Sequence, residues 1–400
     1  MAFGAAILFQ CNIVGFNSLN CLSSPKLPRL FIHRRKYNFN SSNSVVGIRL
    51  SAVFANSKTP IREAAEAQLE EDINTFSPSS ATTSSGWSVF AEKVSGEWDG
   101  FGADFSKEGE PIELPESVVP EAYREWDVKV FDWQTQCPTL AHPTHHSQLM
   151  YKLIKLLPTV GCEADAATKY SVLERNINDS NTVVAFAYQS SGCYVAVWQP
   201  VAAAAKASGS VSLLLELEHC LVDPRDKESR VRIIQAVSAV VKEKLIMMQL
   251  EGIQVFCEQW YGPFRNGEQL GGCAIRDSAF ASTQALKTSQ VTGVWQGLPA
   301  AIASFHQDYD SQLQEENVII RELVVVDAEN VPKPCSRDGS GLILLPKQLW
   351  CSSNQEKPGE TCFQVGWLLD DGLAITSKCS FSADAKLKEI AIGSEKMQRW

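Results

Sequence analysis

The chain carries one short glycine–tryptophan motif twice, and this repeat constrains its fold more than any other feature. The pattern G-x-W-x-G occurs first at Gly96, Trp98 and Gly100 and again at Gly293, Trp295 and Gly297. Each copy precedes a series of strand-like segments. A tryptophan between glycines suits the entry to a small antiparallel barrel, because the indole closes the end and the glycines permit a tight bend. The repeat predicts two barrels in one chain, with these six residues as structural entry motifs.

The N-terminal region has the composition of a targeting segment. Its first 62 residues contain no Asp or Glu, but eight Lys or Arg and eight Ser. Such an acid-free, Ser-rich, Arg-containing leader is typical of an organelle transit peptide. Gln10, Cys11 and Asn12 interrupt the short apolar start, which argues against a secretory signal. We expect residues 1–55 to be a chloroplast transit peptide, with mitochondrial import or an unstructured tail as alternatives.

The charge of the remaining chain excludes one class of partner. Removing the eight leader bases from the 36 Lys and Arg leaves 28 against 46 Asp and Glu, a formal charge of −18. A strongly acidic protein is poorly suited to a phosphate backbone, so we expect no nucleic-acid partner. No later segment approaches the roughly 20 apolar residues that span a bilayer, so we expect no membrane span.

Composition shifts divide the chain. Residues 56–86 are polar, with a short helical stretch at Ile61–Ile73 followed by a Ser-rich run, and predict a flexible linker. We expect a first β-barrel domain over residues 87–275 and a second over residues 276–400. The boundary falls in a connector, Arg265–Gln290, that contains several glycines.

Alternating apolar residues and turn signals predict an antiparallel β protein. One segment is an exception: the apolar residues of His146–Leu157 fit helical spacing, so a helix is expected there. The fold class is therefore mainly β, with two calycin- or lipocalin-like antiparallel barrels in tandem and few short helices. The expected strands are Trp126–Trp133, Val183–Tyr188, Tyr194–Trp198, Val211–Leu221, Arg230–Val241, Asn317–Val326, Leu342–Leu345, Gln364–Leu369 and Leu373–Ser380.

No motif for chemistry stands out. The histidine group His142, His145 and His146 is interrupted by Pro143 and lacks the spacing of a zinc site, so a solvated loop is the favoured interpretation. There is no C-x-x-C, no G-x-S-x-G and no P-loop. We expect no catalytic, cofactor-binding or metal-binding residues, no cofactor, and a protein that is not an enzyme.

Two further groups of residues bear on the barrel interiors. The carboxylates Glu216, Glu218 and Asp223 are expected on solvated strand faces and turns. A barrel interior could also hold an apolar ligand or pigment, although strand-borne tryptophans more often belong to a core. The candidate lining residues are Trp126, Trp133, Trp198, Trp260, Trp350 and Trp367.

Taken together, the leader and several motifs resemble one plant family. The motifs are the two G-x-W-x-G copies, Trp126–Trp133, and the C-terminal block from Leu344–Trp350 through Val365-Gly366-Trp367. In this order they resemble the biogenesis factor required for chloroplast ATP synthase, a calycin-like family shared with cyanobacteria. The resemblance covers roughly residues 87–400.

The resemblance implies a function and a place in the cell. It implies a stromal protein of two β-barrels that helps assemble the catalytic head of the ATP synthase. Such a factor brings the β and γ subunits together transiently and is not a subunit of the finished enzyme. Peripheral association with the thylakoid is compatible with this role. The alternatives are a calycin-type protein that handles a tetrapyrrole or lipid, and a hydrolase whose site residues are dispersed and carry no motif.

Overall fold

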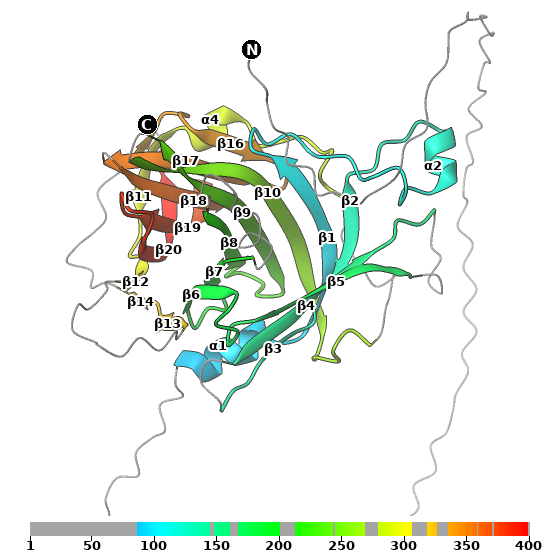
Figure 1. Cartoon of the computed structure of the whole chain (residues 1–400), viewed down its shortest axis with the longest axis horizontal. Coiled ribbons are helices and arrows are strands. Elements are labelled where there is room, and N and C mark those ends of the chain that lie inside the picture. Colours follow the sequence, from blue (N-terminus) through cyan, green and yellow to red (C-terminus); the bar gives the residue numbers. More distant parts are fainter. Residues whose placement is uncertain are drawn as a thin grey trace, which may run out of the picture. The chain divides into compact units, whose positions relative to one another are not determined.

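A computed structural model of the chain describes the greater part of residues 86–400 (Figure 1). These residues all belong to one compact unit, Ser77–Trp400. The predicted transit peptide and most of the linker, including Ile61–Ile73, lie outside the described residues. The described ranges are 86–144, 148–160, 167–200, 213–242, 245–268, 279–305, 318–325, 335–357, 359–369 and 372–398.

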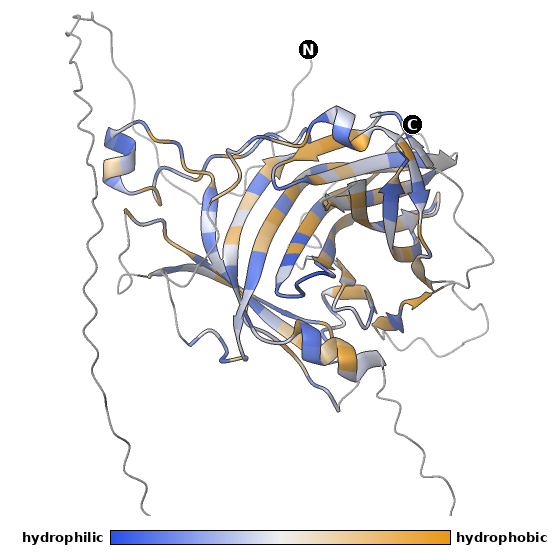
Figure 2. Cartoon of the chain, turned by 180° about the vertical axis from the view of Figure 1, so that it is seen from behind, coloured by the Kyte–Doolittle hydropathy of each residue, from blue (hydrophilic) through white to orange (hydrophobic). Residues whose placement is uncertain are grey.

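The prediction of a mainly β fold with few short helices is confirmed. The described residues form two curled, largely antiparallel sheets and three helices, α1 (Gly86–Val94), α2 (Glu121–Glu125) and α4 (Thr288–Val291). Figure 2 shows hydrophobic and hydrophilic residues alternating along the long strands. This alternation gives each sheet two chemically different faces.

The first sheet has eleven strands in the order β13-β6-β7-β8-β9-β10-β1-β2-β4-β3, with β5 paired to β4. Every pair is antiparallel except β13 with β6. Its strands are β1 (Glu97–Ser106), β2 (Asp132–Gln136), β3 (Thr139–Ala141), β4 (Leu149–Leu156), β5 (Lys169–Asn176), β6 (Val183–Tyr188), β7 (Tyr194–Trp198), β8 (Leu213–Val222), β9 (Ser229–Lys242), β10 (Leu245–Gly262) and β13 (Ile319–Glu322).

The second sheet has nine strands in the order β14-β12-β20-β19-β18-β17-β16, and β11 pairs with both β15 and β20. Its strands are β11 (Gly293–Gly297), β12 (Ala301–Ser304), β14 (Val324–Val325), β15 (Cys335–Arg337), β16 (Leu342–Leu345), β17 (Leu349–Lys357), β18 (Glu360–Leu368), β19 (Leu373–Phe381) and β20 (Leu387–Met397).

The predicted hairpins are confirmed, and one prediction is wrong. β6–β7, β8–β9 and β18–β19 pair as expected. The segment predicted as a helix, His146–Leu157, instead contains β4, which pairs with β2, β3 and β5. Leu149, Tyr151 and Leu153 are buried while Met150 is exposed, so the strand period of two governs this segment. Pairing on both edges of β4 overrides the helical spacing of its leucines.

Two other predicted strands are shorter than expected. The segment Trp126–Phe131 lies outside the strand, which begins at Asp132. Asp127 has a left-handed φ of 53°, and the backbone folds back on α2 through a bond from the Val128 N–H to the Tyr123 carbonyl of 2.9 Å. The second case, Asn317–Val326, is split into β13 and β14 because Leu323 turns inward and donates its N–H to the Tyr188 carbonyl at 2.7 Å.

One face of the first sheet packs against one face of the second. Two hydrophobic clusters fill this contact, and they include Val195, Leu217, Ile233 and Val255 from the first sheet with Phe363, Val365, Ile375 and Ile390 from the second. A polar link between His219 Nδ1 and Ser377 Oγ (2.9 Å) crosses the same contact. Burial lowers the pKa of His219 to about 3, so its ring is neutral at physiological pH.

The first sheet draws on both predicted domains. Its strands precede the expected boundary except β13, which joins it beside β6, whereas every strand of the second sheet lies beyond the boundary. The division into domains over 87–275 and 276–400 stays a prediction. No helix among the described residues has the length and apolar character needed to cross a membrane.

Candidate functional site

The two G-x-W-x-G motifs form the same local structure. Trp98 and Trp295 are almost fully buried. Each indole N–H donates to a carbonyl four residues earlier, Trp98 to Val94 at 3.0 Å and Trp295 to Val291 at 2.6 Å. Those carbonyls belong to the last residues of α1 and α4, so each tryptophan satisfies an acceptor that a helix end leaves open.

The glycines of the motifs have different roles. Gly96 and Gly293 have φ values of 145° and 130°, which L side chains rarely adopt. They turn the chain from the helix into the strand. Gly100 is needed for space, since a Cβ there would lie 1.9 Å from the Cys257 carbonyl oxygen. Gly297 ends β11 with a φ outside the left-handed region.

An arginine covers each motif tryptophan. The Arg230 guanidinium lies 4.1 Å from the Trp98 ring centre. The Arg337 guanidinium lies 5.2 Å from the Trp295 ring and 4.0 Å from the Trp350 ring. A desolvated cation over an indole face is a favourable contact. The two motifs therefore share a local structure as well as a sequence. Each combines a helix end, a glycine with positive φ, a buried tryptophan and an arginine over the indole ring.

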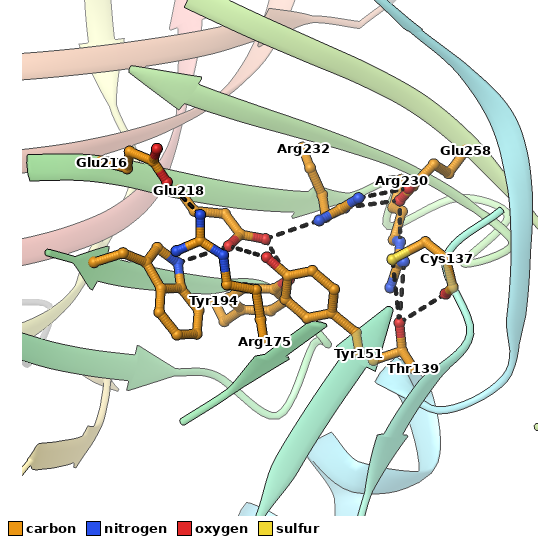
Figure 3. A network of polar contacts seen from close by, with 11 residues as sticks. Cys137, Thr139, Tyr151, Arg175, Tyr194, Glu216, Glu218, Arg230, Arg232 and Glu258 are labelled. Atoms are coloured by element: carbon orange, nitrogen blue, oxygen red, sulfur yellow. Dashed lines mark hydrogen bonds and ion pairs between the residues drawn. The ribbon is translucent and has the colours of Figure 1, made fainter. Parts of the chain in front are cut away.

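In the first sheet this arginine belongs to a buried charge network, shown in Figure 3. The network lies on the inner face, which we define as the face that carries Trp98, Tyr151, Tyr194 and Phe256. Arg230 and Arg232 on β9 alternate with Val231, and Glu218 on β8 and Glu258 on β10 lie on either side of them. All four charged side chains are 0–1% exposed.

Glu218 accepts hydrogen bonds from four side chains. Its donors are the hydroxyls of Tyr151 (2.6 Å) and Tyr194 (2.9 Å), the indole N–H of Trp198 (2.8 Å) and Arg232 (3.0 Å). Burial alone would raise the pKa of Glu218, but Arg232 and the Tyr151 hydroxyl hold it below its ordinary value. Burial, followed by the charge of Glu218, raises the pKa of both tyrosines. The carboxylate is therefore charged and its phenol partners are neutral.

Glu258 is held by the two arginines. It accepts from Arg230 Nε at 2.7 Å and from Arg232 at 2.8 and 3.0 Å. Against the effect of burial, both guanidinium groups hold the pKa of Glu258 below its ordinary value. Arg230 also donates to Thr139 Oγ1 at 3.2 Å. The four charges cancel, so the inner face carries an electrically neutral network.

The side chains of this network pack against one another and against aromatic rings on the inner face. Arg232 lies 4.9 Å from the ring of Tyr151 and 5.0 Å from that of Phe256. At the rim, Arg175 of β5 pairs with Glu216 and lies 4.7 Å from the Trp198 ring. Two open clefts of about 510 and 240 Å³ lie elsewhere, and no residue of the network lines either of them. The arrangement suits rigid support of the sheet more than turnover of a substrate.

The sequence-based prediction for the carboxylates is wrong at Glu218. This residue is fully buried, and Asp223 at the following turn is also nearly buried, at 4% exposure. The signal was present as Glu216-x-Glu218 beside Arg230-x-Arg232 on two strands of one hairpin. Because side chains alternate with a period of two, both glutamates and both arginines of this hairpin lie on one face, where charges can pair across the strands.

The other candidate residues are dispersed. Among the described residues no group of three His, Cys, Asp or Glu could hold a metal ion. His142 lies in a loop with its Nδ1 3.1 Å from Thr144 Oγ1, while His145 and His146 lie outside the described residues. Trp198 and Trp350 are buried in the cores, whereas Trp126 is 63% exposed. The described candidate tryptophans therefore do not line a common cavity.

Two further carboxylates, Asp132 and Glu97, bind backbone N–H groups of the connector Arg265–Gln290. Asp132 accepts from the backbone N–H groups of Phe280 and Ala281, each at 2.9 Å, and Glu97 accepts from those of Arg265 and Gly267. Asp99 lies two residues after Glu97 on β1, opposite Gln136 of β2, and is 4% exposed. Burial raises the pKa of Asp99 to about 7, the Gln136 side chain lowers it, and the charges of Glu97 and Glu258 raise it further.

This raised pKa predicts a pH-dependent effect of Asp99→Asn. The folded protein holds the Asp99 proton up to about pH 7, whereas the unfolded chain releases it near the ordinary value of 3.8. Between these values stability falls as pH rises, because the folded state binds more protons. Asp99→Asn should therefore raise the free energy of unfolding at pH 8 by about 1–3 kcal/mol, with little effect near pH 4. Urea titrations at both pH values would measure this, and equal effects at pH 4 and pH 8 would contradict it.

Comparisons with known proteins yield a distant structural likeness. No family model matches the chain, and no curated protein matches it. One solved structure that it resembles is a protein of unknown function from the DUF3598 family of Nostoc punctiforme. The identity is 14%, the TM-score is 0.42, and the match covers 78% of this chain and 99% of that one.

Proposed function

We propose that this protein is an assembly factor for the catalytic head of the chloroplast ATP synthase, acting in the stroma on the β and γ subunits. The observation that carries the proposal is the distribution of apolar side chains between interior and surface. The inner face of the first sheet is occupied by its own aromatic and charged residues. Exposed apolar residues lie on outer strands instead, including Val172 and Leu173 on β5 and Val324 and Val325 on β14.

Such a surface suits a transient protein partner. Exposed apolar residues on strands at sheet edges are contact points for other chains. The resemblance of the motifs and leader to the ATP synthase biogenesis factor supplies the identity of the partners. The acidic chain remains soluble and can approach basic protein surfaces. A role in handling a tetrapyrrole or lipid receives less support, because buried side chains occupy the inner face that a ligand would need.

The proposal predicts which proteins the mature chain recovers from stroma. A tagged chain beginning after residue 55 should retain the β and γ subunits in a pull-down, and plants lacking the protein should accumulate less ATP synthase. Recovery of neither subunit, together with normal ATP synthase levels in the knockout, would reject the proposal. Purification with a bound tetrapyrrole would favour the ligand-handling alternative.

A further inference from the structure

The strand β5 lies at one edge of the first sheet and has a single neighbour among the described strands. In the part of the chain that the structure describes, β5 pairs with β4 alone. The next strand along the chain, β6, pairs with β7 and β13 instead of returning to β5. The segment β13 thus pairs with the edge of β6 (Figure 1), while no described strand pairs with the outer edge of β5.

The backbone of β5 presents hydrogen-bonding groups at this open edge. Ile177 donates its N–H to the Leu149 carbonyl at 3.1 Å, and Met150 is registered opposite Asn176. In an antiparallel pair, residues alternate between bonding to the partner strand and pointing away from it. By this alternation, Val172 and Glu174 direct their N–H and C=O groups outward. Two outward residues provide up to four backbone hydrogen bonds to an added strand.

Three side chains of β5 are apolar and are exposed to an extent that edge strands usually avoid. Tyr170, Val172 and Leu173 are 44–47% exposed, and Met150 on the adjacent strand is 37% exposed. Val172 and Leu173 point to opposite faces, so both faces of the edge are apolar. Natural sheets usually protect such edges with charged residues, proline or a covering segment. A strand added here would cover apolar surface on both faces as well as the backbone groups.

The charges around β5 define the chemistry of the missing strand. Glu174 pairs with Lys152 at 3.3 Å, and Arg175 pairs with Glu216. Lys169, at the start of β5, is exposed and has no ion-pair partner among the described residues. A complementary segment would carry apolar residues on both faces, beside Val172 and Leu173, and an acidic residue near Lys169.

From these observations we infer that the open edge of β5 binds an extended segment of an unassembled ATP synthase subunit by β-strand addition. The bound segment is apolar on both faces beside Val172 and Leu173 and carries an acidic residue opposite Lys169. This inference rests on the proposed function and adds the surface through which it acts. It does not require the inner face, so the buried network stays intact during binding.

Proline at position 172 tests the edge directly. Val172→Pro removes an outward N–H while leaving the bonds between β4 and β5 in place. A labelled mature chain would be titrated with purified β or γ subunit. We expect Val172→Pro to weaken binding about tenfold, as the loss of one backbone bond predicts. Val172→Thr, which keeps the N–H and the branched shape, should weaken binding far less. Val128→Ser, at an exposed valine outside both sheets, should bind like the unmodified chain.

The possible outcomes separate this inference from the function on which it rests. If the unmodified chain binds a subunit and Val172→Pro binds equally well, the edge inference fails and the function stands. If the unmodified chain binds neither subunit, both fail. If the unmodified chain is a dimer on size-exclusion chromatography and Val172→Pro is a monomer, the edge binds a second copy of this chain. That result would overturn the inference. Should Val172→Pro not fold, Val172→Lys decides, with the same loss of binding expected.

Discussion

Trp98→Ala and Trp295→Ala should each lower the free energy of unfolding by about 3–5 kcal/mol. Both indoles are almost fully buried, each donates a hydrogen bond to the end of a helix, and each lies under an arginine. Truncation would leave a cavity, remove the donor and expose one face of the guanidinium that covers the indole. Urea unfolding followed by circular dichroism would measure the loss.

A matched control is available in the same chain. Trp126 is 63% exposed, so Trp126→Ala should change stability by no more than about 0.5 kcal/mol. If Trp98→Ala and Trp295→Ala were both as stable as this control but failed to bind a partner, the motifs would be binding sites. That result would contradict a structural role for the two tryptophans.

The second large effect is expected at the centre of the charge network. Arg232→Met should lower the free energy of unfolding by about 3–5 kcal/mol, because it leaves Glu218 short of a donor and Glu258 with one arginine instead of two. Methionine keeps much of the side-chain length, so the loss reports the charge more than the volume. The comparison is Arg321→Met, which removes an exposed guanidinium on β13 and should have little effect.

The same network has a defined pH dependence. The pKa values of Glu218 and Glu258 are below their ordinary values in the folded protein. Their stabilising contribution is therefore present at neutral pH and is lost as pH falls through the acidic range. The destabilisation of Arg232→Met should shrink as the pH is lowered, when protonated carboxyls no longer need a cation. A loss below about 1 kcal/mol at pH 7 would show that the network contributes little.

Local patterns in the sequence predicted the strands whose neighbours along the chain are also their partners. The hairpins β6–β7, β8–β9 and β18–β19 are of this kind, since turn residues and alternation act together over short distances. Helical spacing predicts a helix where β4 forms, because the register of β4 depends on β2, β3 and β5 at once. The join of β13 to β6 involves residues more than a hundred positions apart, and no local signal marks it.

The candidate site was only partly predictable for a related reason. Trp98 and Trp295 were identified because glycine and tryptophan are restrictive residues with a repeated spacing. Alternation assigns Glu218 to one face of its strand but does not show what covers that face, so the sequence alone predicts a solvated carboxylate there. The curvature of the sheet and the aromatic rings of Tyr151 and Tyr194 bury it. The arginines over the tryptophans lie on other strands, so their contacts depend on the complete fold.

The most direct test of the proposed function is cross-linking mass spectrometry in isolated chloroplasts that are assembling ATP synthase. It identifies the partner and the contacting face together. We predict cross-links from lysines beside the open edge, Lys152 and Lys169, to the β or γ subunit. Cross-links from this protein to neither subunit, under conditions where other assembly contacts are recovered, would contradict the proposed function.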